Sequence, residues 1–121
     1  MLGGITTNIF SFSDPRPPIG MVLEGRAGDD ILRGTKGRDL IFGGSGDDII
    51  RGFGRADTLS GGPANDRLIG GPGRDRLRGG EGRDRLFARD NQRDRVNGGP
   101  GRDAARIDAG LDRVVSIAEF F

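Results

Sequence analysis

Aspartate recurs at a fixed interval of nine residues, behind a glycine-rich stretch, over most of the chain. Starting at Gly25, the sequence divides into ten blocks such as GRAGDDILR, GGSGDDIIR and GGPGRDRLR, which reach residue 115. One block, 88–97, has ten residues, and its extra residue is placed before Asp94. An array of carboxylates at constant spacing is a candidate set of cation ligands. Every block carries aspartate at its sixth position: Asp30, Asp39, Asp48, Asp57, Asp66, Asp75, Asp84, Asp94, Asp103 and Asp112.

The residues around these carboxylates decide which cation suits them. Glycine tolerates positive φ, so a glycine-rich loop can turn its carbonyl oxygens inward, toward the aspartate that closes it. Carbonyls and carboxylates form a hard, all-oxygen ligand set, which suits Ca²⁺ better than Mg²⁺. The chain has no cysteine and no histidine, so the usual ligands of zinc and copper are missing.

A short strand must follow each loop and hold it in place. Two positions after each aspartate the residue is always apolar, and side chains alternate across a strand, so this residue points inward and its neighbours outward. Two blocks make one coil of 18 residues with strands on opposite sides, and ten blocks make about five coils. The periodicity therefore predicts an all-β fold, a parallel β-roll or β-solenoid. The predicted core residues are Leu32, Ile41, Ile50, Leu59, Leu68, Leu77, Leu86, Val96, Ala105 and Val114.

The loops GGSGDD, GGPGRD, GGEGRD and a second GGPGRD complete the nonapeptide pattern GGxGxDxUx. The chain resembles the hemolysin-type, repeats-in-toxin (RTX) calcium-binding β-roll family. The resemblance implies that calcium lies between stacked loops, held by sixth-position aspartates of blocks two apart. It also implies an extracellular protein exported by type I secretion. The implied carbonyl ligands come from the glycine stretches: Gly28, Gly43, Gly44, Gly46, Gly61, Gly62, Gly79, Gly80, Gly82, Gly98, Gly99 and Gly101.

The two edges of the predicted roll differ in how well they keep the pattern. The loops of odd-numbered blocks form one edge, the odd edge, with GRAGDD, GGSGDD, GGPAND, GGEGRD and GGPGRD. The loops of even-numbered blocks form the even edge, with GTKGRD, GFGRAD, GGPGRD, ARDNQRD and IDAGLD. We therefore expect calcium mainly in the four gaps of the odd edge, from Asp30 to Asp103, and fewer ions or none on the even edge.

Arginine is the main departure from the pattern, with 18 residues, many of them directly before or after the sixth-position aspartate. These side chains could neutralise the stacked carboxylates and coat the outer faces. Arginine–aspartate pairs could instead replace calcium in the degenerate loops, which would give a structural or interaction scaffold. A third interpretation is a face that binds a polyanion. The net charge of +1 and the few aromatic residues argue against nucleic acid as the partner.

The composition also excludes other function classes. Without histidine the commonest general base is missing, and the serines have no histidine partner, so we expect no enzyme activity. Hydrophobic residues make up only 33% of the chain, so the core is small and we expect folding to depend on calcium. No N-terminal secretory signal peptide and no membrane-spanning window are recognisable.

The chain ends lie outside the repeat and are predicted to cap the roll. Residues 1–24 form the N-terminal segment, 25–115 the ten repeats and 116–121 the C-terminal cap. An open solenoid end exposes strand edges, which allows end-to-end or face-mediated self-association unless it is covered. The outward residues Ile31, Leu40, Phe42 and Ile49 are unusually apolar, so we expect the N-terminal segment to cover them.

Overall fold

The computed structural model describes residues 9–10, 22–88, 90–108 and 110–121. Each block contributes one three-residue strand at its seventh to ninth positions, as predicted. The strands are β1 Ile9–Phe10, β2 Val22–Glu24, β3 Ile31–Arg33, β4 Leu40–Phe42, β5 Ile49–Arg51, β6 Thr58–Ser60, β7 Arg67–Ile69, β8 Arg76–Arg78, β9 Arg85–Phe87, β10 Arg95–Asn97, β11 Ala104–Arg106, β12 Arg113–Val115 and β13 Glu119–Phe120.

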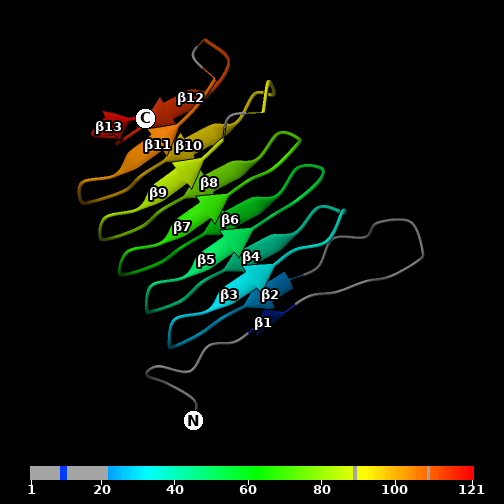
Figure 1. The fold of residues 1–121 in the computed structure, drawn as a ribbon, viewed down its shortest axis with the longest axis vertical. Coiled ribbons are helices and arrows are strands. Elements are labelled where there is room, and N and C mark those ends of the chain that lie inside the picture. Colours follow the sequence, from blue (N-terminus) through cyan, green and yellow to red (C-terminus); the bar gives the residue numbers. More distant parts are fainter. Residues whose placement is uncertain (1–8, 11–21, 89, 109) are drawn as a thin grey trace.

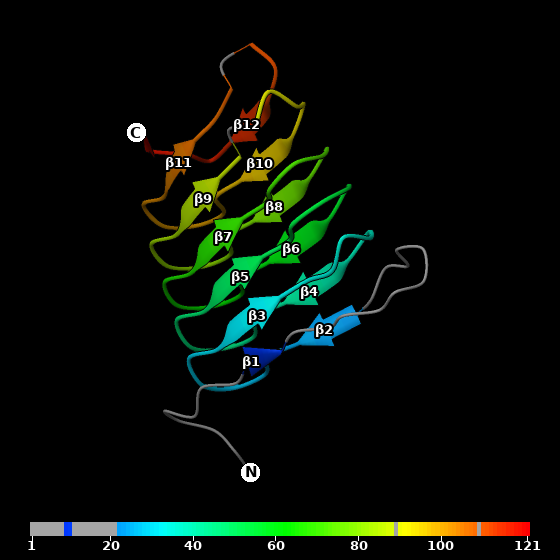
Figure 2. The same ribbon diagram turned by 45° about the vertical axis from the view of Figure 1, so that its right-hand side comes forward.

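The strands form two parallel sheets, one with seven strands in the order β1-β3-β5-β7-β9-β11-β13 and one with six in the order β12-β10-β8-β6-β4-β2. Figure 1 shows the coils stacked along the long axis with the loops on two opposite edges. The turned view in Figure 2 separates the two sheets. Odd-edge loops precede the strands from β3 to β11 of the first sheet, and even-edge loops precede the strands from β4 to β12 of the second. The predicted parallel β-roll is confirmed.

Residues one coil apart lie side by side, which places equivalent loop residues above one another. Leu32 pairs with Ile50, and Ile50 with Leu68, a separation of 18 residues. The ten-residue block stretches this separation to 19 where Leu77 pairs with Val96, without shifting the register. The extra residue is therefore absorbed in the loop, and the aspartate after it stays in line.

The core is a double column of one apolar side chain from each block. Nine of the ten predicted core residues, from Leu32 to Ala105, are at most 1% exposed, and Val114 in the last block is half-buried. Each block thus buries its central strand residue between the sheets, while its strand neighbours lie outside. Leu23, from a strand that precedes the first block, extends the column by one residue.

Three strands lie outside the repeat and were not predicted. β1 and β2 pair with β3 and β4 at one end, and β13 pairs with β11 at the other. At the second end the Phe121 ring meets Phe87 edge-on, with ring centres 5.2 Å apart. Each terminal segment thus adds backbone pairing to the last regular coils, and the capping role stays a prediction.

The outer faces of both sheets keep exposed apolar side chains near the N-terminal end. Phe42 is 38% and Ile49 is 37% exposed. Most of the segment predicted to cover them, residues 1–24, lies outside the described residues, which include only 9–10 and 22–24 of it. Within the part of the chain that the structure describes, no helix is long and apolar enough to cross a membrane.

Candidate metal centres

The loops owe their shape to left-handed backbone at the second and fourth positions. Gly44 and Gly46 have φ of +85° and +96°, values that glycine adopts without steric cost. The carbonyl oxygens at these positions lie against the same positions one coil on. Most second- and fourth-position glycines would place a Cβ against such a carbonyl, and this group includes Gly44, Gly46, Gly62, Gly80, Gly82, Gly99 and Gly101.

Glycine is needed at the first position because a side chain would not fit there, and not because the backbone has a positive φ. A Cβ on Gly25 would meet both the Asp30 Oδ2 and, at 2.7 Å, the Gly43 carbonyl oxygen of the next coil. A Cβ on Gly43 would likewise meet the Asp48 Oδ2 and the Gly61 carbonyl oxygen. Missing side chains thus leave room for a carboxylate oxygen and a carbonyl oxygen to approach the same point. Gly79 has the same arrangement with Asp84 and Gly98.

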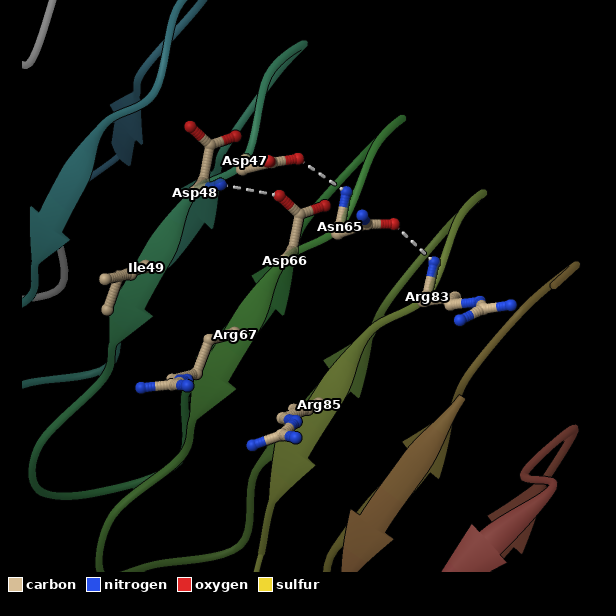
Figure 3. Close-up of a pocket in the computed structure, with 8 residues that line it drawn as sticks. All are labelled: Asp47, Asp48, Ile49, Asn65, Asp66, Arg67, Arg83 and Arg85. Carbon is tan, nitrogen blue, oxygen red and sulfur yellow. Dashed lines mark hydrogen bonds between the residues drawn. The ribbon is translucent and has the colours of Figure 1, made fainter. Parts of the chain in front are cut away.

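The sixth-position aspartates form a ladder along each edge. In every coil the backbone N–H of one aspartate donates to Oδ1 of the aspartate one coil further on. Figure 3 shows one such bond, from the Asp48 N–H to the Asp66 carboxylate, at 2.8 Å. The ladder runs Asp30–Asp48–Asp66–Asp84–Asp103 on the odd edge and Asp39–Asp57–Asp75–Asp94–Asp112 on the even edge, with distances of 2.6–2.9 Å.

The second carboxylate oxygen is buried and lacks a donor in most of these residues. The sixth-position aspartates from Asp30 to Asp103 are at most 3% exposed. A buried carboxylate oxygen without a hydrogen bond is costly, and folded proteins normally pair it or place it on a metal. Within the described residues, Oδ2 finds no hydrogen-bond partner in Asp48, Asp57, Asp66, Asp75, Asp84, Asp94 and Asp103.

The same burial disturbs the protonation of these groups. The pKa of these aspartates is raised mainly because burial removes the hydration of the carboxylate. In most of them the neighbouring carboxylates raise the pKa further, and the N–H bond of the ladder lowers it only in part. The direction is the same for Asp103. The pKa rises from 3.8 to about 7 in Asp48, Asp84 and Asp94, and to about 8 in Asp57, Asp66 and Asp75.

Two even-edge carboxylates are instead satisfied by the protein itself. Asp39 Oδ2 accepts the Thr35 N–H at 2.7 Å, and its Oδ1 accepts the Thr35 hydroxyl at 2.8 Å. In the last block, Asp112 Oδ2 accepts the Asp108 N–H at 2.7 Å. These two loops provide donors, whereas Oδ2 of the other even-edge aspartates, Asp57, Asp75 and Asp94, has none within the described residues. Stronger calcium binding on the odd edge stays a prediction.

A third carboxylate joins the ladder at one place on the even edge. Oxygens of Asp75, Asp90 and Asp94 lie within 4.8 Å of one another. Asp90 was not among the predicted ligands, because it stands at the third position, outside the repeat pattern. The sequence feature that could have identified Asp90 is the extra residue in its block, the only one of the ten blocks with ten residues.

The odd edge carries a second, exposed ladder at the fifth position. The Asn65 N–H donates to the Asp47 carboxylate at 2.9 Å, and the Arg83 N–H to the Asn65 side chain at 2.8 Å, as Figure 3 shows. Asp47 also donates from its N–H to Asp29 at 2.8 Å. These fifth-position residues were not among the predicted ligands. They place two further carboxylates beside the inner ladder, and these help to raise the pKa of Asp48.

The arginines lie mostly outside these ladders. Between described residues, one salt bridge is present, from Arg102 to Glu119 at 3.0 Å, and it joins two exposed side chains. Arg67 and Arg85 stand in register on the outer face of β7 and β9 (Figure 3). Replacement of calcium by arginine–aspartate pairs stays a hypothesis, and the donors seen on Asp39 and Asp112 come from Thr35 and the main chain.

The oxygen set fits a calcium ion, because bare, buried carboxylate oxygens lie beside main-chain carbonyls and the chain has no histidine and no cysteine. Comparison with known families agrees. Residues 24–52 and 51–86, together just over half of the chain, match the family described as RTX calcium-binding nonapeptide repeat (4 copies). No curated protein and no solved structure matches the chain.

Proposed function

Because the chain belongs to the RTX calcium-binding nonapeptide repeat family, we propose that it is a calcium-binding β-roll whose folding depends on the bound ions. The observation that carries the proposal is the series of buried Oδ2 atoms that lack a donor within the described residues, on both edges of the roll. A cation between coils would supply the missing partner. The proposed role is not catalytic.

The candidate ligands of one gap come from two coils. The Asp48 Oδ2 and the Gly61 carbonyl of the following coil border the same space above Gly43. Calcium at such a point would offset the repulsion between stacked carboxylates and would lower their raised pKa values. The core supplies only one buried apolar side chain per block, so these electrostatic contributions are large relative to packing.

We propose that the protein works outside the cell. Extracellular calcium modules have dissociation constants of about 10⁻⁴ to 10⁻³ M. A site of this strength is filled only where calcium is near millimolar. Calcium outside the cell would then drive folding of a chain that stays loosely structured where calcium is scarce.

Circular dichroism and calorimetric calcium titration of the metal-free chain test this function. We expect a weak β signal without metal, recovery at millimolar calcium, and little recovery at equal magnesium. About four bound ions would point to the odd edge alone and about eight to both edges. A full β signal without metal, together with no heat of binding, would overturn the proposal and favour a metal-free scaffold.

As a second candidate function, we propose that the outer face of the six-stranded sheet binds a linear polyanion of the sulfated-glycan class. Arg76, Arg95 and Arg113 lie in register on β8, β10 and β12, and they line a groove that continues to Leu40 and Phe42. Like charges at adjacent strand positions repel, so an anionic chain along the column would relieve them. No salt bridge to these three side chains is present within the described residues.

Retention on heparin in a salt gradient tests the second candidate. Replacement of Arg76, Arg95 and Arg113 by glutamine should lower the eluting salt concentration clearly. The matched control replaces Arg33, Arg51 and Arg67, which are exposed on the other sheet, and removes the same charge. An equal loss in both variants would show that only net charge matters and would reject a specific face.

A further inference from the structure

We propose that the ten-residue block builds a three-carboxylate calcium site from Asp75, Asp90 and Asp94, and that this is the tightest site of the roll. The candidate ligand oxygens of the three residues lie within 4.8 Å of one another. Asp75 and Asp94 are 1% and 0% exposed, and Oδ2 of all three residues lacks a hydrogen-bond partner within the described residues. The inference rests on the proposed function, since it assigns a special site within the same calcium-binding roll.

The extra residue explains how Asp90 reaches the ladder. In several nine-residue blocks the third-position residue is exposed, as Ser45, Pro72 and Glu81 are. In the longer loop, Asp90 is half-buried and its Oδ1 accepts the Gln92 N–H at 2.9 Å. The insertion therefore carries a third-position carboxylate from an exposed position to the gap between coils.

Residues of the last block hold this loop in place. Asp108 Oδ2 accepts the N–H groups of both Asp90 and Asn91, each at 2.8 Å. The Asp94 N–H donates to Asp112 Oδ1 at 2.8 Å. Asp108 and Asp112 thus use carboxylate oxygens to position the loop, while Oδ2 of each proposed ligand has no donor within the described residues.

The number of carboxylates sets this site apart from the other gaps. A gap between regular coils brings together two sixth-position aspartates. Here a third carboxylate oxygen lies within 4.8 Å of the other two, and no other group of acidic residues in the described part of the chain does this. In oxygen-ligand sites, a larger ligand charge and a more rigid loop increase calcium affinity. We therefore expect the first ion to bind here, on the even edge, and to order the neighbouring coils before the other gaps fill.

Calorimetric calcium titration of the full, metal-free chain and of two matched variants tests this site. Asp90→Asn removes the charge but keeps an oxygen for the Gln92 N–H. Glu81→Gln removes the same charge from the third position of the preceding block, where the side chain is exposed. We expect one tight site in the wild type, weakened about tenfold or more by Asp90→Asn. The Glu81→Gln variant should keep the tight site.

The outcomes separate this inference from the proposed function. A tight site that survives Asp90→Asn, or calcium binding in the wild type without any tight site, would overturn the inference and leave the calcium-binding function standing. No calcium binding in the wild type would overturn both. If Asp90→Asn fails to fold at saturating calcium, hydrogen exchange of the wild type decides. The amides of Gln92 and Asp94 should be protected at the lowest calcium concentration, and late protection would contradict the site.

Discussion

The two edges of the roll carry the same repeat but treat its buried carboxylate differently. On the odd edge, Asp48, Asp66, Asp84 and Asp103 each keep an Oδ2 without a donor within the described residues. On the even edge, Asp39 and Asp112 receive N–H donors from their own loops, whereas Asp57, Asp75 and Asp94 do not.

This difference between the edges shows that a sixth-position aspartate alone is not enough to form a cation site. The backbone of the preceding loop decides whether the carboxylate is satisfied by the protein or left for an ion. In the first even-edge loop, the residue responsible is Thr35 at the second position, where the neighbouring odd-edge loop has the left-handed Gly44.

The largest expected effect is a pH dependence of the metal-free roll. Six aspartates have a pKa of about 7 to 8 in the folded chain against 3.8 when unfolded, so the folded state binds more protons. Their contribution is therefore fully present below about pH 4 and is lost as pH rises through 7 to 8. Thermal melts should show a metal-free chain that is more stable at about pH 5 than at about pH 8.

Calcium should reverse this trend, because protons and calcium compete for the same oxygens. With millimolar calcium, the melting temperature should be higher at the more alkaline pH. A metal-free chain that becomes more stable as pH rises would contradict the burial of unpaired carboxylates on either edge.

The next effect contrasts one carboxylate from each edge. Asp66→Asn should reduce stability only when calcium is present, by about 1.4 kcal/mol for a site with a dissociation constant of about 0.1 mM at millimolar calcium. Asp39→Asn should cost about 1–3 kcal/mol with or without calcium, because its amide group faces the Thr35 donors. Chemical unfolding with chelator and with calcium measures both. Equal calcium dependence in the two variants would remove the distinction between the edges.

An effect of similar size is expected from Thr35 itself. Its hydroxyl donates to Asp39 and accepts the Gly37 N–H at 2.9 Å, so Thr35→Val should cost about 1–3 kcal/mol independently of calcium. Thr35→Gly should let the loop adopt the left-handed conformation of Gly44 and add one calcium site to the even edge. Calorimetric stoichiometry decides the second variant, and an unchanged number of sites would show that the loop sequence does not control the choice.

The smallest effect concerns non-glycine residues in left-handed backbone. Ala64 on the odd edge and Arg55 on the even edge have φ of +79° and +64°. Replacement of either by glycine should stabilise the roll by about 1 kcal/mol, because a Cβ is unfavourable in this conformation. Chemical unfolding measures the gain. Gly54→Ala serves as the control, since the nearest atom to a Cβ there is 3.5 Å away and no strain is expected.

The fold was largely predictable from the chain because the repeat is short and strictly periodic. The spacing of Leu32, Ile50 and Leu68 places one apolar side chain inside each coil on the same sheet, and only a parallel roll buries all of them. The added strands β1, β2 and β13 were not predicted, because they lie outside the period and pair through backbone groups that any residue provides.

The candidate sites were predictable only in part. The positions of the sixth-position aspartates follow from the period, but the role of Thr35 does not, since a threonine in a loop has many possible partners. Asp90 was not predicted as a ligand because its position beside Asp75 and Asp94 depends on the conformation of the longer loop. Backbone freedom was the predicted reason for the loop glycines in general, whereas in the structure the first-position glycines make room for a carboxylate oxygen.

Three features follow from the sequence alone: the coil length, the side of each strand that faces the core, and the alignment of acidic residues along two edges. They can be predicted because they depend only on distance along the chain. Tertiary structure decided which carboxylate oxygens find a donor and which remain bare, and where a third carboxylate joins the ladder. The physical reason is that satisfaction of a buried charge depends on atoms brought together from different coils, within a few tenths of an ångström, and the chain order does not specify those contacts.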